Sequence, residues 1–126
     1  GDGGTTGSLL GDVATSTGTT LAFDHSDPYA FGGVISGAGA LSQMGTGTLV
    51  LTGENTYTGG TSITGGTLQV GDGGTTGSIT GDVATSTGTT LAFDHSDSYA
   101  FGGVISGAGA LNQMGTGTLV LTGENT

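Results

Sequence analysis

Short runs of alternating apolar and polar residues, bounded by glycine, recur along the whole chain. A period of two is that of a β-strand with one buried face, and no window holds the 3.6-residue apolar stripe of an amphipathic helix. The pattern therefore predicts an all-β chain with about seven strands in the first 70 residues and the same set again from Ile79 onward. The predicted strands are Leu9 to Val13, Thr20 to Phe23, Tyr29 to Ile35, Leu41 to Met44, Thr48 to Leu51, Thr61 to Ile63 and Thr67 to Val70.

The same alternation predicts which side chains face the core, because successive residues of a strand point to opposite sides. Ala22, Val50 and Gln69 are expected to point outward. The pair Gly32-Gly33 favours a bend or bulge, which shifts the facing of the residues around it. The predicted core is Leu9, Val13, Leu21, Phe23, Phe31, Leu41, Leu49, Leu51, Ile63, Leu68, Val70, Ile79, Val83, Leu91, Phe93, Phe101, Leu111, Leu119 and Leu121.

Residues 71–126 repeat residues 1–56 with four changes: Ile79 for Leu9, Thr80 for Leu10, Ser98 for Pro28 and Asn112 for Ser42. We expect one β-helical unit over residues 1–126, made of a first copy (1–70) and a truncated second copy (71–126). Near-literal copying is typical of an extended structure, whereas an enzyme keeps one site in one irregular cleft.

Three strands per turn would give about 23 residues per turn and about three turns per 70-residue copy, which is the size expected of a parallel β-helix. The whole chain then forms five to six coils, with each coil burying its inward side chains on the next. At ~4.8 Å per stacked strand, the rod is on the order of 25 Å long.

The charge excludes several classes of partner. The chain has no Lys or Arg and a formal net charge of −10, so it has no cation to neutralise nucleic-acid phosphates or an anionic bilayer. No apolar run approaches the roughly 18 residues of a membrane-spanning helix, so we expect no direct membrane insertion, and we expect any export signal to lie outside this sequence. Cys is absent, so no disulfide holds the fold.

Residues 45–71 read GTGTLVLTGENTYTGGTSITGGTLQVG, and the second copy carries the same motif from Gly115 to Thr126. This stretch resembles the passenger-associated β-strand repeat of bacterial autotransporters. The resemblance implies a right-handed parallel β-helix, exported by a Gram-negative bacterium and secreted or displayed at its surface as an adhesin-like stalk, and it brings no catalytic residue. In the same motif, Asn55 and Asn125 follow a strand, where an Asn side chain can bond the backbone of its own turn.

The densest polar cluster is Asp24, His25 and Asp27, repeated as Asp94, His95 and Asp97. Two carboxylates and an imidazole are secondary candidates for a divalent metal site, but the favoured interpretation is an acidic surface loop that caps its own turn. A Ser lies beside each His, yet a nucleophilic triad is built from separate elements that converge in a pocket. We therefore expect no catalytic residue, no cofactor and no enzyme activity.

The leading hypothesis is a structural stalk and folding module, whose partners are neighbouring repeats of its parent protein. The alternative is direct adhesion or self-association through the acidic, Thr-rich face, including end-to-end contacts between copies. Ice binding and calcium binding are minor alternatives, because Thr15-x-Thr17-x-Thr19 and Thr46-x-Thr48 are similar to hydroxyl rows and Gly1-Asp2-Gly3-Gly4 to a calcium-binding nonapeptide. Both need regularly stacked copies, and these segments are widely spaced.

Overall fold

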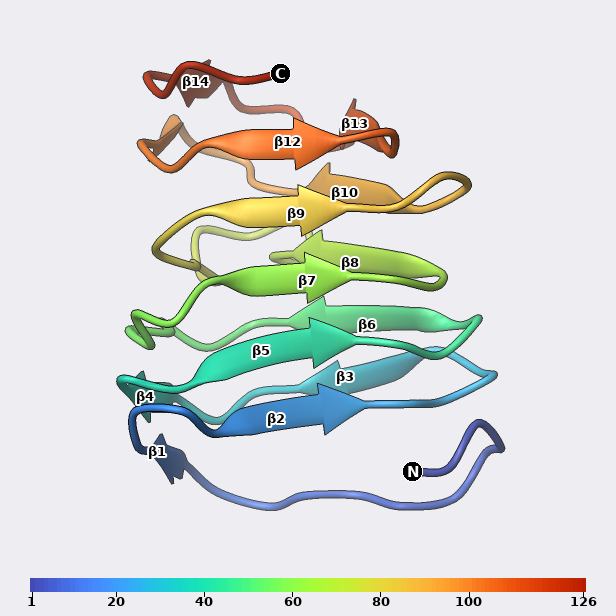
Figure 1. The fold of residues 1–126 in the computed structure, drawn as a ribbon. Coiled ribbons are helices and arrows are strands. Elements are labelled where there is room, and N and C mark those ends of the chain that lie inside the picture. Colours follow the sequence, from blue (N-terminus) through green and yellow to red (C-terminus); the bar gives the residue numbers. More distant parts are fainter.

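A computed structural model describes all 126 residues and confirms the all-β fold, with no helix (Figure 1). The chain accordingly contains no helix that could span a bilayer. Its strands are β1 (Val13–Thr15), β2 (Thr20–Phe23), β3 (Tyr29–Phe31), β4 (Ile35–Gly37), β5 (Ala40–Gln43), β6 (Thr48–Leu51), β7 (Thr61–Ile63), β8 (Thr67–Val70), β9 (Val83–Thr85), β10 (Thr90–Phe93), β11 (Tyr99–Phe101), β12 (Ile105–Gly107), β13 (Ala110–Gln113) and β14 (Leu119–Leu121).

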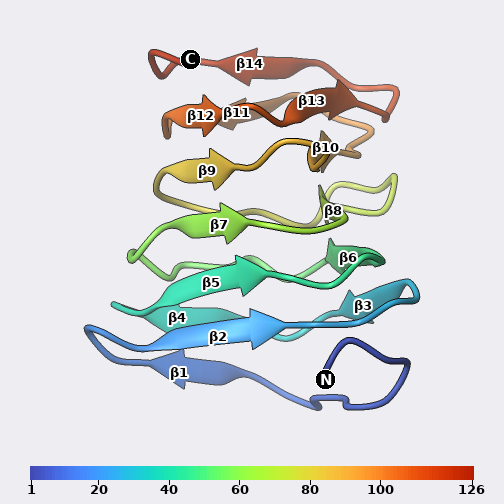
Figure 2. The same cartoon turned by 45° about the vertical axis from the view of Figure 1, so that its right-hand side comes forward.

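The strands stack on three faces, and all pairings between them are parallel. Face 1 is the five-stranded sheet β2-β5-β7-β9-β12, and face 2 is the five-stranded sheet β3-β6-β8-β10-β13. Face 3 holds the pairs β1-β4 and β11-β14; between these pairs, the segments around Glu54 and Ser78 meet in a single bridge. The rod therefore contains about five coils, each with one pass over each face (Figure 2).

The coil is right-handed, as expected. In Figure 1 the face 1 strands run from left to right at the front, and the chain returns behind them while it climbs. Register partners on successive coils lie 19 to 23 residues apart, as in Thr48↔Thr67 and Thr67↔Thr90. One turn is thus slightly shorter than the predicted 23 residues.

The prediction of about three turns per copy was slightly low, because each copy makes three turns and a further third. β2 lies on face 1, but its counterpart β10 lies on face 2; likewise β3 lies on face 2 and β11 on face 3. The sequence count missed the pass over face 3 at residues 54–57, which lacks regular alternation. It also merged two other passes over face 3 with neighbouring strands: residues 78–80 with β9, and β4 with β3. Identical sequences in the two copies therefore face directions about one-third of a turn apart.

The predicted strand from Tyr29 to Ile35 was also wrong, since the structure divides it into β3 and β4. The bend falls at Gly32-Gly33, where the chain turns from face 2 to face 3. A Cβ at Gly33 would collide with the carbonyl of Gly11 in the coil below, so only glycine permits this close approach. The bend places Ile35, which the predicted core left out, in the interior with no exposed surface.

Inward side chains from the three faces form one narrow core. Leu49, Leu51, Leu68 and Val70 are each at most 2% exposed, and the neighbouring Val50 is only partly covered. Two residues of the predicted core are not buried: Leu9 is 40% exposed and Leu111 is 42% exposed, because no further coil covers them. Four more members of that set are half-buried and pack against the core from the end coils: Val13, Leu21, Leu119 and Leu121.

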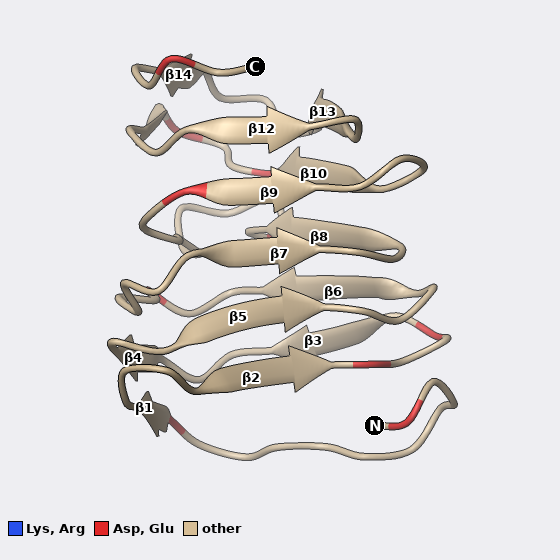
Figure 3. Cartoon of the chain, viewed as in Figure 1, with Lys and Arg blue, Asp and Glu red and all other residues tan.

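The ten acidic residues all lie outside the strands, at corners and in connecting segments (Figure 3). On stacked strands, residues directly opposite each other lie close together, and like charges there would be destabilising. Placing carboxylates at the corners leaves the sheets free of charge. The net charge of −10 is thus carried along the edges of the rod.

Candidate functional site

A His, an Asp and a Tyr gather at one corner in each copy. The lower cluster is His25, Asp27 and Tyr29, and the upper cluster is His95, Asp97 and Tyr99. Each cluster follows the end of a strand, β2 or β10, and finishes at the first residue of the next. The imidazole stacks on the phenol ring, with ring centroids 4.6 Å apart in the lower cluster and 4.5 Å apart in the upper one.

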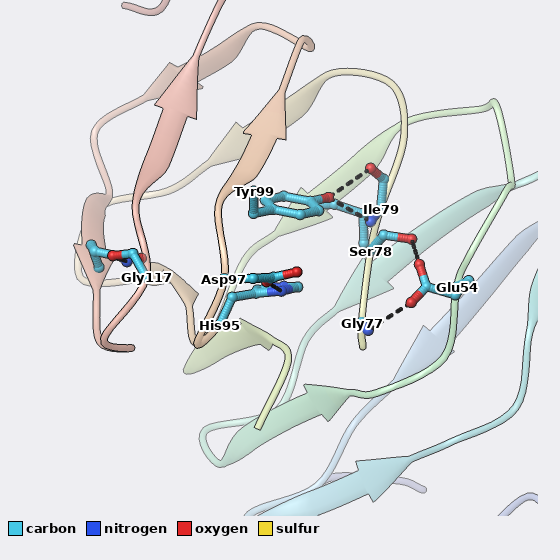
Figure 4. Close-up of polar contacts among 9 residues, drawn as sticks. Glu54, Gly77, Ser78, Ile79, His95, Asp97, Tyr99 and Gly117 are labelled. Atoms are coloured by element: carbon cyan, nitrogen blue, oxygen red, sulfur yellow. Dashed lines mark hydrogen bonds and ion pairs between the residues drawn. The ribbon is translucent and has the colours of Figure 1, made fainter. Parts of the chain in front are cut away.

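Each Tyr hydroxyl of these clusters ties two coils together. The Tyr29 hydroxyl accepts a hydrogen bond from the Leu9 N–H (2.8 Å) and donates one to the Leu9 carbonyl (3.3 Å). Tyr99 does the same with Ile79, at 3.2 and 3.3 Å (Figure 4). Burial raises the pKa of the Tyr99 phenol, so the phenol stays neutral and can donate.

The prediction of an acidic surface loop was wrong for the two imidazoles, because both are buried. His25 is 7% exposed and His95 is 3% exposed, because each ring is covered by the stacked Tyr. The imidazole Nδ1 lies 3.4 Å from the carboxylate of Asp27 in the lower cluster and 3.5 Å from that of Asp97 in the upper one. Neither contact qualifies as a hydrogen bond, and both Nδ1 atoms lack a partner. The rings therefore act mainly as packing surface.

The structure brings together only part of each proposed metal-ligand set. His25 lies against Asp27, and His95 against Asp97, but Asp94 instead accepts a hydrogen bond from the Gln69 amide (3.3 Å). Asp24 lies beside Gly3 in the N-terminal loop. No group of three or more His, Cys, Asp or Glu side chains is placed to hold a metal ion. Each cluster thus offers one imidazole and one carboxylate, fewer ligands than zinc or calcium takes in proteins.

Tyr57 is the most deeply buried phenol, with no exposed surface. Its hydroxyl lies 2.6 Å from the Thr61 hydroxyl. Burial raises the pKa of Tyr57 to about 12, although the hydrogen bond to Thr61 acts in the opposite direction. A phenol with this pKa remains protonated at neutral pH, which suits a structural hydrogen bond rather than proton transfer.

Glu54 fastens one coil to the next on face 3. Its carboxylate accepts a hydrogen bond from the Gly77 N–H (3.2 Å) and another from the Ser78 hydroxyl (2.7 Å), as Figure 4 shows. Thr80 adds a third link, since its hydroxyl donates to the Tyr57 carbonyl (2.6 Å). The residue that corresponds to Thr80 in the first copy, Leu10, is 99% exposed and has no coil beneath it.

Two buried amides close the corners of the inner coils. Asn55 accepts a hydrogen bond from the Ile35 N–H and donates to the carbonyls of Gly53 and Ser78. Gln43 donates to the carbonyls of Gly47 and Thr67. The Asn55 contact with Gly53 is the bond to its own turn that the sequence predicts, whereas the bond to Ile35 joins two coils.

Comparison with known families agrees with this architecture. Residues 41–70 and 111–126 match the model of a family described as Passenger-associated-transport-repeat. These segments are autotransporter passenger repeats. The first match covers most of β5 and all of β6 to β8, and the second covers most of β13 and all of β14. The matched segments therefore lie in the middle of the rod and in its last coil.

Similarity to a curated protein also supports an autotransporter passenger repeat. Over 42 residues, 33% of its length, this chain is 52% identical to a segment of the Adhesin BmaC autotransporter of Brucella suis biovar 1 (strain 1330). The matched segment is 1% of that protein. No solved structure matches the chain. The chain is thus similar, over these residues, to a segment of an autotransporter adhesin.

Sequence reasoning missed several residues that hold the coils together. Gln43 could have been found, because it lies two residues after the inward-facing Leu41 and so faces the core by the same alternation. Tyr57 and Glu54 lie in a segment without alternation, and nothing in their spacing indicates burial or a partner. Their contacts depend on which coil lies above or below, and therefore on the true length of each turn.

Proposed function

We propose that these passenger repeats form a rigid, non-catalytic spacer and folding module of an autotransporter protein that is secreted by, or displayed on, a Gram-negative bacterium. The observation that carries this proposal is the unbroken parallel ladder of faces 1 and 2, which runs through five coils. A continuous ladder makes a stiff rod, since each coil is hydrogen-bonded to the next.

The chemistry of the clusters supports a structural role. The His rings are buried against Tyr, and the Tyr hydroxyls bond the backbone of the coil below. Ser26 and Ser96, which follow the imidazoles in the sequence, are exposed to solvent. Catalysis by a nucleophile needs that hydroxyl within hydrogen-bond reach of a base, and neither Ser makes such a contact.

A display experiment tests the spacer function. Residues 1–126 are placed between an epitope and an autotransporter barrel in a Gram-negative host, alongside two matched variants, Leu51→Asp and Val50→Asp. We expect the epitope to reach the cell surface with the unchanged chain and with Val50→Asp, and to be lost or degraded with Leu51→Asp. Equal display of all three would contradict a role that depends on the folded rod.

Direct adhesion is the second candidate, and it rests on the name of the Brucella relative. It predicts that the isolated chain binds host cells saturably and that charge-neutralising changes on the corners, such as Asp27→Asn with Asp97→Asn, reduce binding. A pure spacer predicts no saturable binding of the isolated chain in the same assay.

A further inference from the structure

The two copies share one corner but differ at one peptide bond in it. Residues 23–31 and residues 93–101 are identical except that Ser98 replaces Pro28. The lower cluster therefore contains an Asp–Pro bond, and the upper cluster contains an Asp–Ser bond at the same place. The imidazole Nδ1 lies 3.4 Å from the neighbouring carboxylate in the lower cluster and 3.5 Å in the upper one. The chain thus holds two closely matched bonds, of which only one precedes a proline.

The Asp27–Pro28 bond has the chemistry of an easily hydrolysed peptide. An Asp carboxylate can attack its own carbonyl carbon, because the attack closes a five-membered ring. A proline nitrogen belongs to a tertiary amide, and its additional alkyl group makes it more basic than the nitrogen of an ordinary peptide. Such a nitrogen departs readily once a proton donor protonates it.

Asp27 lies at the boundary between the core and the solvent. Its side chain is 45% exposed, but its Oδ1 atom is buried and has no hydrogen-bond partner. No donor occupies the lone pairs of this oxygen, so they are available for attack on a carbonyl carbon. Pro28 is exposed, so water can reach the bond between the two residues.

The imidazole of His25 lies beside the carboxylate that would react. Its Nδ1 faces Asp27 Oδ1 at 3.4 Å and has no hydrogen-bond partner of its own. The ring is 7% exposed and is fixed by its stack on Tyr29. When it carries a proton, this ring is a positioned acid next to the Asp27–Pro28 bond.

The coil above holds the carbonyl of this bond in place. Gly47 lies so close that a Cβ there would collide with the Asp27 carbonyl. The Gly47 N–H also donates a hydrogen bond to the His25 carbonyl (2.9 Å). These contacts keep the carbonyl carbon, the carboxylate and the imidazole in one rigid corner, which favours a reaction between them. Gly117 makes the same two contacts in the upper cluster.

Few other titratable groups surround this corner. Those on the same segment or in the loop below it are Asp24, Tyr29, Asp2 and the amino group of Gly1. Residues 44–48, in the coil above, contain no titratable side chain. None of these groups is hydrogen-bonded to His25 Nδ1 or Asp27 Oδ1. Proton transfer at the bond therefore involves mainly the imidazole and the carboxylate.

We propose that the Asp27–Pro28 bond is a self-cleavage site of the folded rod, with the Asp27 carboxylate as nucleophile and the His25 imidazolium as proton donor. A carboxylate oxygen bonds to the Asp27 carbonyl carbon, and the C–N bond to Pro28 breaks as the nitrogen takes the imidazolium proton. The products are a cyclic anhydride at Asp27 and a free Pro28 amine. One water molecule then opens the anhydride to two carboxyl groups, and the imidazole regains a proton from solvent.

The cleaved rod stays assembled. β1 and β2, which precede the bond, pair with β4 and β5, which follow it. The Tyr29 hydroxyl also bonds the Leu9 backbone across the cut. Cleavage therefore separates the two parts covalently while the ladders hold them together. It is a single event within the chain and goes beyond the spacer function, because a rod that is never cleaved still spans a distance.

Mass spectrometry of the folded chain kept at about pH 5, in the range where imidazoles take up protons, tests the proposal. We expect a new N-terminus at Pro28 and an intact bond after Asp97. A synthetic peptide of residues 22–32 contains the same bond and the same His without the fold. The folded chain should be cleaved at least about tenfold faster than this peptide, because only the fold positions the imidazole.

Three variants locate the chemistry, and circular dichroism checks that each is folded. Pro28→Ser should abolish the cut after Asp27, and Ser98→Pro should create a new cut after Asp97. His25→Phe keeps a ring stacked on Tyr29 but removes the proton donor, so its cleavage rate should fall to that of the peptide. Ser98→Pro keeps the test decisive even where His25→Phe does not fold.

Three outcomes would overturn the proposal. Equal cleavage rates of the folded chain and the peptide would show that the fold contributes nothing to the reaction. The absence of a cut after Asp97 in Ser98→Pro would show that the shared corner does not promote cleavage before proline. Unchanged cleavage in folded His25→Phe would exclude the imidazole as the proton donor.

Discussion

Faces 1 and 2 are joined by continuous backbone ladders, whereas the middle of face 3 combines a few backbone hydrogen bonds with side-chain bridges. On the first two faces, five strands pair in continuous parallel ladders. On face 3 the ladder is interrupted, and Glu54, Asn55 and Tyr99 bridge successive coils through the hydrogen bonds described above. The comparison shows that successive coils of one rod can be held together in two ways. A regular backbone ladder tolerates many different side chains, whereas an irregular stretch depends on hydrogen bonds from particular side chains.

The largest expected effect is on face 2. Leu51 is fully buried, so Leu51→Asp forces a carboxylate into the narrow core and should cost more than about 4 kcal/mol, enough to abolish cooperative unfolding. Val50→Asp, on the outer side of the same strand, should change the free energy of unfolding by less than about 1 kcal/mol. Urea unfolding followed by circular dichroism measures both, and equal damage from the two variants would refute the assigned facing.

On face 3, Asn55→Ala should cost about 1–3 kcal/mol, because it leaves the buried Ile35 N–H without a partner. Asn125 is the matched control: it makes the corresponding bond to Ile105, but it lies in the end coil and is exposed. Asn125→Ala should therefore cost clearly less in the same urea experiment. If the two substitutions have equal effects, burial by the next coil does not strengthen this contact.

Tyr57→Phe removes the hydrogen bond to Thr61 and should cost about 1 kcal/mol at neutral pH. Burial raises the folded-state pKa of Tyr57 from the ordinary value of 10.0 to about 12. The neutral phenol therefore contributes stability that is fully present below pH 10 and lost as pH rises towards 12. The unchanged chain should lose more stability than Tyr57→Phe over this interval, as measured by denaturation at a series of alkaline pH values; parallel loss in both would contradict the assignment.

The smallest effect is expected from Glu54→Gln, which keeps one acceptor for the Ser78 hydroxyl and loses the negative charge. A loss of about 0.5–1 kcal/mol follows for a largely solvated contact. Glu124→Gln, in the second copy, removes a carboxylate with no such partner and should be neutral. Thermal unfolding of the two variants compares them, and a larger loss for Glu124→Gln would argue against the bridge.

The difference between the faces also explains what the sequence could predict. Alternation located β2, β5, β6, β7 and β8 to within a residue or so, because their inward residues are regularly spaced, and the glycine-rich motif indicated the parallel coil. It did not locate the passes over face 3, since Asn55 and Tyr57 are buried by the geometry of a turn. Missing those passes gave three turns per copy in place of three and one-third.

The candidate site was less predictable than the fold. The spacing of Asp24, His25 and Asp27 shows that they are near one another, but not that the imidazole turns inward onto Tyr29. That orientation depends on the coil below, where Leu9 bonds the Tyr29 hydroxyl. A single sequence contains no direct signal for a contact between residues 20 apart that belong to different coils.

The central claim is that the chain forms a stacked coil in which each strand of the second copy lies one face further round than its counterpart in the first. Contacts between backbone protons, measured by NMR, test this claim most directly. The account predicts contacts of Leu41 with Thr61 above it on face 1, and of Leu91 with Leu68 below it on face 2. Leu91 is the counterpart of Leu21, which lies directly below Leu41. If each copy made three whole turns, Leu21, Leu41 and Leu91 would lie on one face, and a single residue would lie above Leu41 and below Leu91. Backbone contacts from a single residue to both leucines would contradict the account.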